Sequence, residues 1–219
     1  MSVARPTGRG LLWVLSLGVA GYALVGYSTM PLGKLVHPDM TASFTAHPVA
    51  VYLHVFAAAV ALLLGPFQFS TRLRRRALPV HRWSGRVYLG AGVLVGGVSG
   101  LYLSWFAYGG PVARLGFAAL AVGWLYTGAR AYVAIRNRRI DEHRRWMVRN
   151  FALAFAAVML RLYVPASVVA GADFTVAYAV IAWLCWVPNL IVAEAIVNAS
   201  DPVHRTLSAK GVQPPARPR

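Results

Sequence analysis

Two short segments of the chain carry the same set of side chains, each at the mouth of a long apolar run. Residues 81–83 and 143–146 both begin with a histidine, continue with arginine and end with tryptophan. Two histidines from different helices, at one depth in a bundle, can ligate a haem iron from both sides through their imidazole nitrogens. The spacing therefore makes His81 and His143 candidate axial ligands of a b-type haem.

The same residue types also fit a second interpretation, in which they anchor the helices at the membrane surface. Histidine, arginine and tryptophan at a helix mouth contact lipid headgroups. If a haem is bound, the arginines near the two histidines would pair with its propionates. These are Arg82, Arg86, Arg144 and Arg149. The residues alone fit haem b and the absence of any cofactor equally.

Two further ionisable residues, His54 and Arg161, lie inside apolar runs, where leaving a polar group unpaired is costly. Arg161 follows His143 by eighteen residues, or five helical turns, so both share a helix face about 27 Å apart. We expect Arg161 to meet an acceptor on the second, third or sixth span and to form an outer polar site with His54. The alternatives are a neutral His54 bonded to a neighbouring helix and an Arg161 that reaches the outer headgroups.

Glycines recur along the third apolar run and admit two interpretations. Gly92, Gly96 and Gly100 are spaced four residues apart, and Gly85 and Gly92 fall near the face of His81. Such a pattern lets two helices approach closely, which is its commoner use in membrane spans. It would also leave room for a flat macrocycle beside His81.

These residues depend on long apolar helices for their positions. The chain of 219 residues is 58% hydrophobic and 13% charged, about half the charged fraction of a soluble domain. We therefore predict an all-α integral membrane protein with six transmembrane helices. Pro165 is expected to end the fifth span. The predicted spans are residues 11–28, 48–69, 81–106, 114–136, 146–164 and 174–197.

The basic residues predict the orientation of this domain, residues 1–200. Two precede the first span, six lie between Arg72 and Arg86, seven between Arg130 and Arg149, and four in the tail, while only Lys34 and Arg114 fall on the other side. By the positive-inside rule, the protein crosses the inner (plasma) membrane several times with both termini in the cytoplasm. Residues 201–219 are expected to be a basic, disordered cytoplasmic tail.

Composition also excludes some classes of partner and site. Membrane topology already accounts for the net charge of +16, so we do not expect nucleic acid as a partner. The single cysteine, Cys185, rules out an intrachain disulfide and a cysteine-based metal site.

Four motifs in order along the chain resemble a catalogued family: HVFAAAVALLLGPFQF, LPVHRWSGRVYLGAG, DEHRRWMVRNFALAFAAVMLRLYVP and WVPNLIVAE. They resemble predicted bacterial membrane proteins classed as domain of unknown function 2306 (DUF 2306), over about residues 47–194. This resemblance implies a multi-span inner-membrane protein and no particular activity.

A weaker resemblance is to the cytochrome b561 group, whose four-helix cores pair histidines between alternate helices. This resemblance implies that spans two to five form a four-helix core like that of a b-type cytochrome. His54, His81 and His143 would stand on its first, second and fourth helices. The third, residues 114–136, has no histidine, which removes the partner of His54. At most one haem, between His81 and His143, agrees with this resemblance.

Two functions follow from these residues. The first is a membrane redox protein, an oxidoreductase or an electron carrier, with one bis-histidine haem near the cytoplasmic face and a quinone or another redox partner. The second is a non-enzymatic membrane protein, such as a small transporter or an assembly factor, that uses the intramembrane polar site of His54 and Arg161. Both place the chain in a lipid bilayer, and neither defines a substrate, catalytic residues or an oligomeric state.

The predicted topology can be tested with reporter fusions. A reporter fused after Arg219 should read cytoplasmic, and one inserted near Thr41 should read outside, because one span precedes Thr41 and five follow it. Paired alkaline phosphatase and fluorescent protein fusions measure this directly. An outside signal from the C-terminal fusion would mean that a span has been miscounted.

Overall fold

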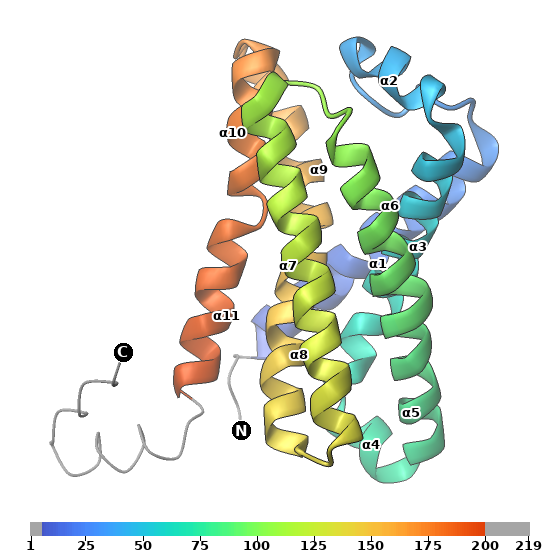
Figure 1. Cartoon of the computed structure of the whole chain (residues 1–219), viewed down its shortest axis with the longest axis vertical. Coiled ribbons are helices and arrows are strands. Elements are labelled where there is room, and N and C mark those ends of the chain that lie inside the picture. The colour runs from blue at the N-terminus through green and yellow to red at the C-terminus, as the bar shows by residue number, and fades with distance from the viewer. Residues whose placement is uncertain (1–5, 200–219) are drawn as a thin grey trace, which may run out of the picture.

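The computed structural model describes residues 6–199, which fold into a bundle of helices (Figure 1). Six helical stretches in this part of the chain are long and apolar enough to cross a membrane: Gly10–Thr29, Pro48–Gln68, Leu78–Ser104, Gly110–Arg136, Ile140–Val169 and Phe174–Ala199. The prediction of an all-α membrane protein with six spans is therefore confirmed. The tail predicted to be disordered, residues 201–219, lies outside the described residues.

Three spans are single helices and three are divided. The single ones are α1 (Pro6–Thr29), α3 (Pro48–Gln68) and α7 (Gly110–Arg136). The divided spans consist of α5 (Leu78–Val87), the π-helix η2 (Tyr88–Leu94) and α6 (Val95–Ser104); α8 (Ile140–Ala154) and α9 (Ala156–Val169); and α10 (Phe174–Leu184) and α11 (Val187–Ala199). Short helices connect the spans: η1 (Pro38–Met40), α2 (Thr41–Ala46) and α4 (Thr71–Arg76).

The third and fifth spans begin earlier than predicted, at Leu78 and Ile140. His81 and His143 therefore lie within helices rather than at the edge of a loop, so backbone hydrogen bonds fix the direction of each side chain. Pro165 does not end the fifth span but lies inside α9. A proline removes only one N–H bond from a helix, and in a membrane neighbouring helices compensate for the loss.

The second to fifth spans form a ring of four helices. In this ring α3 packs against α6, α6 against α7, and α7 against α8, while α8 also contacts α3. The first span lies outside the ring, where α1 packs on α3 and α9. The sixth span covers the other side, with α10 against α7 and α9 and α11 against α8 (Figure 1). This is the four-helix arrangement predicted from the sequence.

Glycines let the helices of the ring approach closely. A Cβ atom on Gly92 would lie 3.1–3.3 Å from atoms of Ala61 on α3, including its backbone. One on Gly96 would lie 3.0 Å from the Trp124 ring, and one on Gly128 would lie 2.8 Å from Val93. Of the two interpretations of this pattern, close packing is the one that the structure supports. The space predicted for a macrocycle along this seam is filled.

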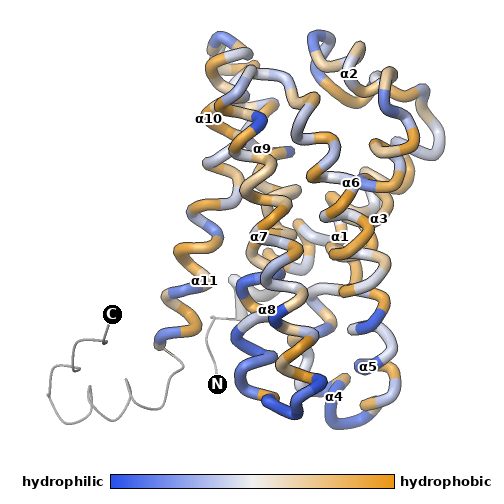
Figure 2. The backbone as a smooth tube through the Cα atoms, viewed as in Figure 1, coloured by the Kyte–Doolittle hydropathy of each residue, from blue (hydrophilic) through white to orange (hydrophobic). Residues whose placement is uncertain are grey.

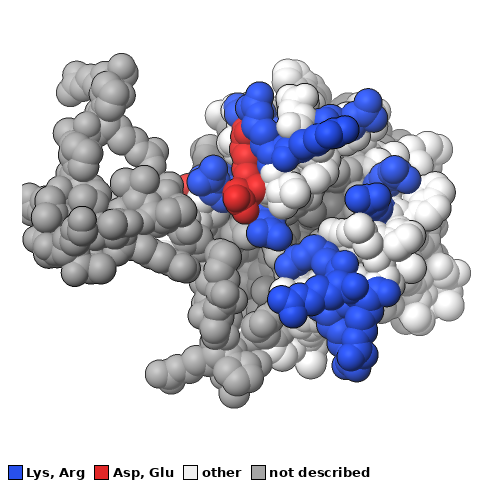
Figure 3. All heavy atoms as spheres, turned by 90° about the horizontal axis from the view of Figure 1, so that it is seen from below, with Lys and Arg blue, Asp and Glu red and all other residues white. Residues whose placement is uncertain are grey.

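The two ends of the bundle differ in charge. Hydrophilic residues concentrate at the end that carries α4 and the turn between α7 and α8, which we call the basic end (Figure 2). Viewed onto this end, Lys and Arg side chains cover much of the surface (Figure 3). Large apolar side chains are exposed along the flanks, for example Val25, Val176 and Ile191, each of which is 64% exposed. Such flanks are typical of a protein surface that faces lipid.

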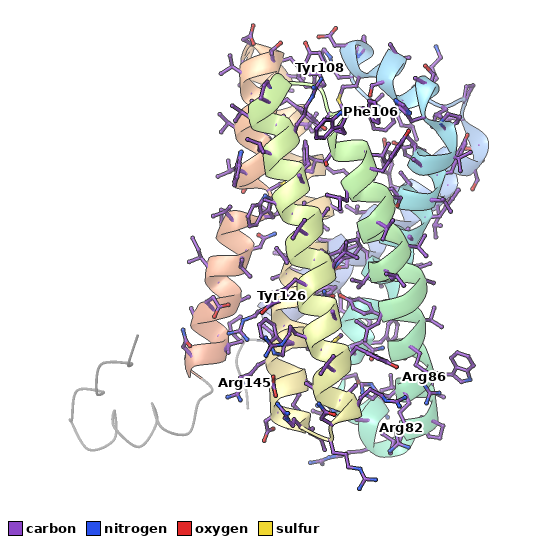
Figure 4. All side chains as sticks on the ribbon, in the orientation of Figure 1. Arg82, Arg86, Phe106, Tyr108, Tyr126 and Arg145 are labelled. Atoms are coloured by element: carbon purple, nitrogen blue, oxygen red, sulfur yellow. The ribbon has the colours of Figure 1, made fainter. Side chains whose placement is uncertain are left out.

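At the opposite end, residues 30–47 fold over the bundle and are held there by ring contacts. The His37 ring stacks on Phe174 with centroids 3.6 Å apart, and the His47 ring stacks on Phe106 at 3.9 Å. The Tyr108 hydroxyl donates to the Asp39 carboxylate at 3.1 Å. Figure 4 shows Phe106 and Tyr108 at this end. These histidines therefore serve to attach the loop.

The glycine packing predicts a clear difference between two neighbouring positions of η2. Gly92→Val should lower the free energy of unfolding by about 1–3 kcal/mol, because the new side chain meets the backbone of Ala61. Gly90→Val is the matched control, since a Cβ at Gly90 has no atom within 4 Å. Thermal unfolding in detergent, followed by circular dichroism, measures both. Equal losses at the two positions would contradict the packing argument.

Candidate functional site

The structure brings His81 and His143 to the same depth at the basic end. Helices α5 and α8 both start at this end and run in the same direction (Figure 1). Seven residues after each histidine, the Tyr88 hydroxyl donates a hydrogen bond to Asn150 Oδ1 at 2.7 Å. Each histidine therefore lies about 10.5 Å along its helix from this bond. The two rings are close enough to interact electrostatically.

The hydrogen bonding of the two imidazole rings differs. His143 Nδ1 lies 2.8 Å from the Ala131 carbonyl oxygen on α7. A carbonyl only accepts, so Nδ1 carries the proton and Nε2 is left with a lone pair, as in histidines that bind metals. His81 Nδ1 is buried and has no hydrogen-bond partner among the described residues. Within residues 6–199 no cluster of three or more potential metal ligands forms, but a haem iron needs only two from the protein.

Arginines make the surroundings of this pair positive. Arg74 of α4 donates to the Gln68 carbonyl at 3.1 Å, and it lies within electrostatic range of His81 and Arg144. Partial burial, together with the charge of Arg144, lowers the pKa of Arg74. Arg144 also pairs with Asp141 at 3.3 Å, and this ion pair is on the exposed side of α8. The site therefore suits an anionic group.

The four arginines predicted to pair with propionates do not all face the histidines. Arg82 lies near His81, and Arg144 near His143. Arg86 instead lies over the exposed Trp83 ring at 5.9 Å, and Figure 4 shows Arg82 and Arg86 together on the lower part of α5. Arg149 makes two hydrogen bonds to Glu194 of α11, at 2.6 and 2.8 Å. This ion pair occupies Arg149, which is not available to an anion at the histidines.

Arg74 is the residue near the histidines that the sequence did not single out. It is the first of three consecutive arginines, residues 74–76, and the sequence alone does not show which of them is buried. The Ser70 hydroxyl caps α4 by accepting from the Leu73 N–H, and this orients the short helix so that Arg74 is half-buried. Its neighbours Arg75 and Arg76 are exposed.

A buried polar network closes the bundle above the histidines. Asn150 donates to the Trp124 carbonyl at 2.8 Å and to Thr127 Oγ1 at 2.9 Å, while accepting from Tyr88. Asn150 and Tyr88 are fully buried, and Thr127 is 5% exposed. The sequence signal was an asparagine next to an apolar run, a residue type that needs partners inside a membrane.

The outer residues His54 and Arg161 take separate partners. His54 Nδ1 donates to the Gly96 carbonyl at 2.8 Å, and Gly100 leaves room for the ring. This hydrogen bond agrees with the alternative prediction, in which His54 is bonded to a neighbouring helix. Arg161 donates to the carbonyl of Ala157 on its own helix at 3.0 Å and faces tyrosines of α1. The two residues are within electrostatic range, but no hydrogen bond joins them in the described structure.

The predicted acceptor for Arg161 on the second, third or sixth span was therefore wrong. The prediction extended one regular helix over five turns from His143. In the structure, α8 ends at Ala154 and α9 begins at Ala156, so the two side chains need not share a face. His143 faces α7, whereas Arg161 faces α1, which covers this part of α9.

A groove of about 340 Å³ lies between α7, α8 and α11 on the other side of α8. Helix α11 is separated from α10 by a break at residues 185–186 and packs on α8, while α10 packs on α7. The Trp146 ring has Arg130 and Arg149 guanidinium groups within 4.8 Å of its centre. The groove is lined mainly by apolar and aromatic side chains: Tyr126, Trp146, Leu153, Trp186 and Leu190. The Arg149–Glu194 ion pair also lines it.

The buried network predicts a stability difference between two tyrosines. Tyr88→Phe should lower the free energy of unfolding by about 1–3 kcal/mol, because Asn150 loses its hydroxyl donor in a site without water. Tyr132→Phe is the control, since Tyr132 is 50% exposed. Thermal unfolding of the detergent-solubilised protein measures both changes. A Tyr88 variant as stable as the control would show that this bond does not hold α5 and η2 to α8.

Comparison with known proteins agrees with the fold and assigns no activity. No curated protein and no solved structure matches the chain. The comparisons therefore give no support to the weaker resemblance to the cytochrome b561 group. The model of one family, described as "Predicted membrane protein (DUF2306)", matches residues 51–197, which include both histidines of the candidate site. The chain belongs to this DUF2306 family of predicted membrane proteins.

Proposed function

We propose that the protein is a membrane electron-transfer protein that binds one b-type haem between His81 and His143. The observation that carries this proposal is the position of the two histidines. They lie on parallel helices, each seven residues before a partner in the Tyr88–Asn150 hydrogen bond. Equal depth and a common interior direction are what two axial ligands of one iron require.

The donor set supports the same proposal. The Ala131 carbonyl fixes the His143 ring with Nε2 unprotonated, and the buried His81 Nδ1 lacks a partner. Arg74 brings one guanidinium group to this place. Arg144 can bring a second, because its ion pair with Asp141 is exposed to solvent, and two guanidinium groups suit the two propionates of a haem. A bound haem would supply a one-electron redox centre whose potential depends on its axial ligands.

Packing deeper in the bundle limits the proposed site to the basic end. The Tyr88–Asn150–Thr127 network and the contact of Gly92 with Ala61 fill the interior beyond it. Electron exchange would therefore take place near one membrane surface rather than across the bilayer. By the positive-inside rule this surface is the cytoplasmic side of a bacterial inner membrane.

A membrane electron carrier needs a diffusible partner, and we place a quinone in the groove between α7, α8 and α11. The groove has aromatic and apolar walls suited to a flat ring and an isoprenoid chain. Arg149 can donate to a quinone oxygen, and Glu194 can accept from a quinol hydroxyl. Trp146 lies three residues after His143 on α8, so both proposed sites share this helix.

A second candidate function rests on the outer half of the bundle. His54 and Arg161 are polar residues in apolar spans and lie within electrostatic range of each other. Such residues mark transport paths in many membrane proteins. A small transporter or an assembly factor, without a cofactor, would use these residues and leave His81 and His143 dispensable.

Absorbance spectra of the purified full-length protein test the haem proposal. After expression with ample haem, we expect a Soret band that shifts on reduction with dithionite, at about one haem per chain. His81→Ala and His143→Ala should each abolish the band, whereas His47→Ala should leave it unchanged, because His47 only stacks on Phe106 at the opposite end.

Two results would reject the proposal. One is a protein without a Soret band after haem-supplemented expression. The other is a band that survives in both histidine variants. If, in addition, growth or transport phenotypes depend on His54 and Arg161 alone, the second candidate function is favoured.

A further inference from the structure

The basic end has two groups of arginines, and within residues 6–199 only one of them forms ion pairs with acidic side chains. On α7 and α8, Arg130 and Arg139 pair with Glu142, at 3.3 and 3.2 Å. Arg144 pairs with Asp141, as noted above. In Figure 3 the acidic side chains lie within only one of the groups of basic side chains. The α7–α8 turn therefore supplies counter-charges for three of its arginines, Arg130, Arg139 and Arg144.

The second group, on α4 and α5, has no such partners among the residues that the structure describes. Its five exposed arginines make no ion pair with any carboxylate in the described part of the chain: Arg72, Arg75, Arg76, Arg82 and Arg86. The sequence has no acidic residue between Asp39 and Asp141. Like charges this close repel each other, so a counter-charge from outside the protein would stabilise this surface.

Apolar side chains beside these arginines place the surface at the membrane boundary. Val80 and Trp83 are three residues apart on one face of α5 and are 56% and 65% exposed. Leu78, at the start of the helix, is 41% exposed. The Arg86 guanidinium lies over the Trp83 ring at 5.9 Å. Tryptophan at this level lies among headgroups, and arginine reaches from there towards phosphate.

We propose that the exposed face of α4 and α5 binds anionic phospholipids of the leaflet at the basic end. All six basic residues between residues 72 and 86 are arginine, and none is lysine. The planar guanidinium fork fits phosphate with two hydrogen bonds, whereas the lysine ammonium does not. A zwitterionic lipid brings its own positive charge and cannot compensate this surface. An anionic headgroup such as phosphatidylglycerol supplies the missing charge.

This binding would act on the segment that carries His81. In the sequence His81 follows Val80 and precedes Arg82, both of which are exposed. On the helix its side chain lies on the side opposite the exposed face. A lipid bound along α4 and α5 therefore holds the helix that presents His81 to the interior. The inference does not depend on the haem proposal, because none of the residues tested below belongs to that site.

Lipid titration of the purified, delipidated full-length protein in detergent tests this inference. Short-chain phosphatidylglycerol and phosphatidylcholine are added separately, and native mass spectrometry counts the lipids bound. We expect the wild type to bind phosphatidylglycerol about tenfold more tightly than phosphatidylcholine, or more. The triple variant Arg72→Gln, Arg75→Gln, Arg76→Gln should lose this preference, because three arginines of the surface are removed.

The matched control removes three charges from the α7–α8 turn, where Asp141 and Glu142 lie among the arginines, in the variant Arg130→Gln, Arg138→Gln, Arg139→Gln. It should keep the preference. The inference is overturned if the wild type binds both lipids equally, or if both triple variants lose the preference alike. Salt gives a readout that needs no variant: raising ionic strength should weaken phosphatidylglycerol binding and spare phosphatidylcholine. Equal salt dependence, or displacement by millimolar inorganic phosphate, would also overturn it.

Discussion

The hydrogen bond between Tyr88 and Asn150 organises the inner half of this bundle. Both side chains are fully buried, and in a membrane no water is present to take the place of either partner. The bond holds α8 to the third span, and the further bonds of Asn150 to the Trp124 carbonyl and to Thr127 include α7. Three of the four core helices are thus fixed in one register. The alignment of His81 with His143 is a consequence of this register, not of any contact between the two rings.

The register also explains why the two ends of the bundle have different chemistry. Beyond the network, glycines allow α3, the third span and α7 to pack tightly, and His54 finds a backbone acceptor in Gly96. At the basic end the helices carry arginines, and α4 turns Arg74 towards the histidines. An anionic ligand could be bound there without breaking any contact of the core.

Hydrophobic runs and the distribution of charge predicted the six spans, because a span is a pattern that continues over about twenty residues. The four-helix core was implied only by the weaker resemblance. The types and spacing of the residues also singled out His81 and His143. What they missed depends on single events. The helix break after Ala154 directs Arg161 towards α1, and Pro165 lies inside α9 instead of ending it. The Ser70 cap orients α4 so that Arg74, and not Arg75 or Arg76, is half-buried. No repeating pattern marks such events.

The π-helix η2, which lies next to the candidate site, also could not be predicted from the sequence pattern. Its wider turn begins at Tyr88, the residue that bonds to Asn150. Within this segment Gly92 packs against Ala61 of α3, and the adjacent Val93 packs against Gly128 of α7. Two neighbouring residues thus fill two different interfaces while Tyr88 reaches α8. A helix of 3.6 residues per turn would place these three residues on different faces, and a sequence analysed with that period cannot predict the change. The local widening lets one span contact three neighbours at the level where the buried network forms.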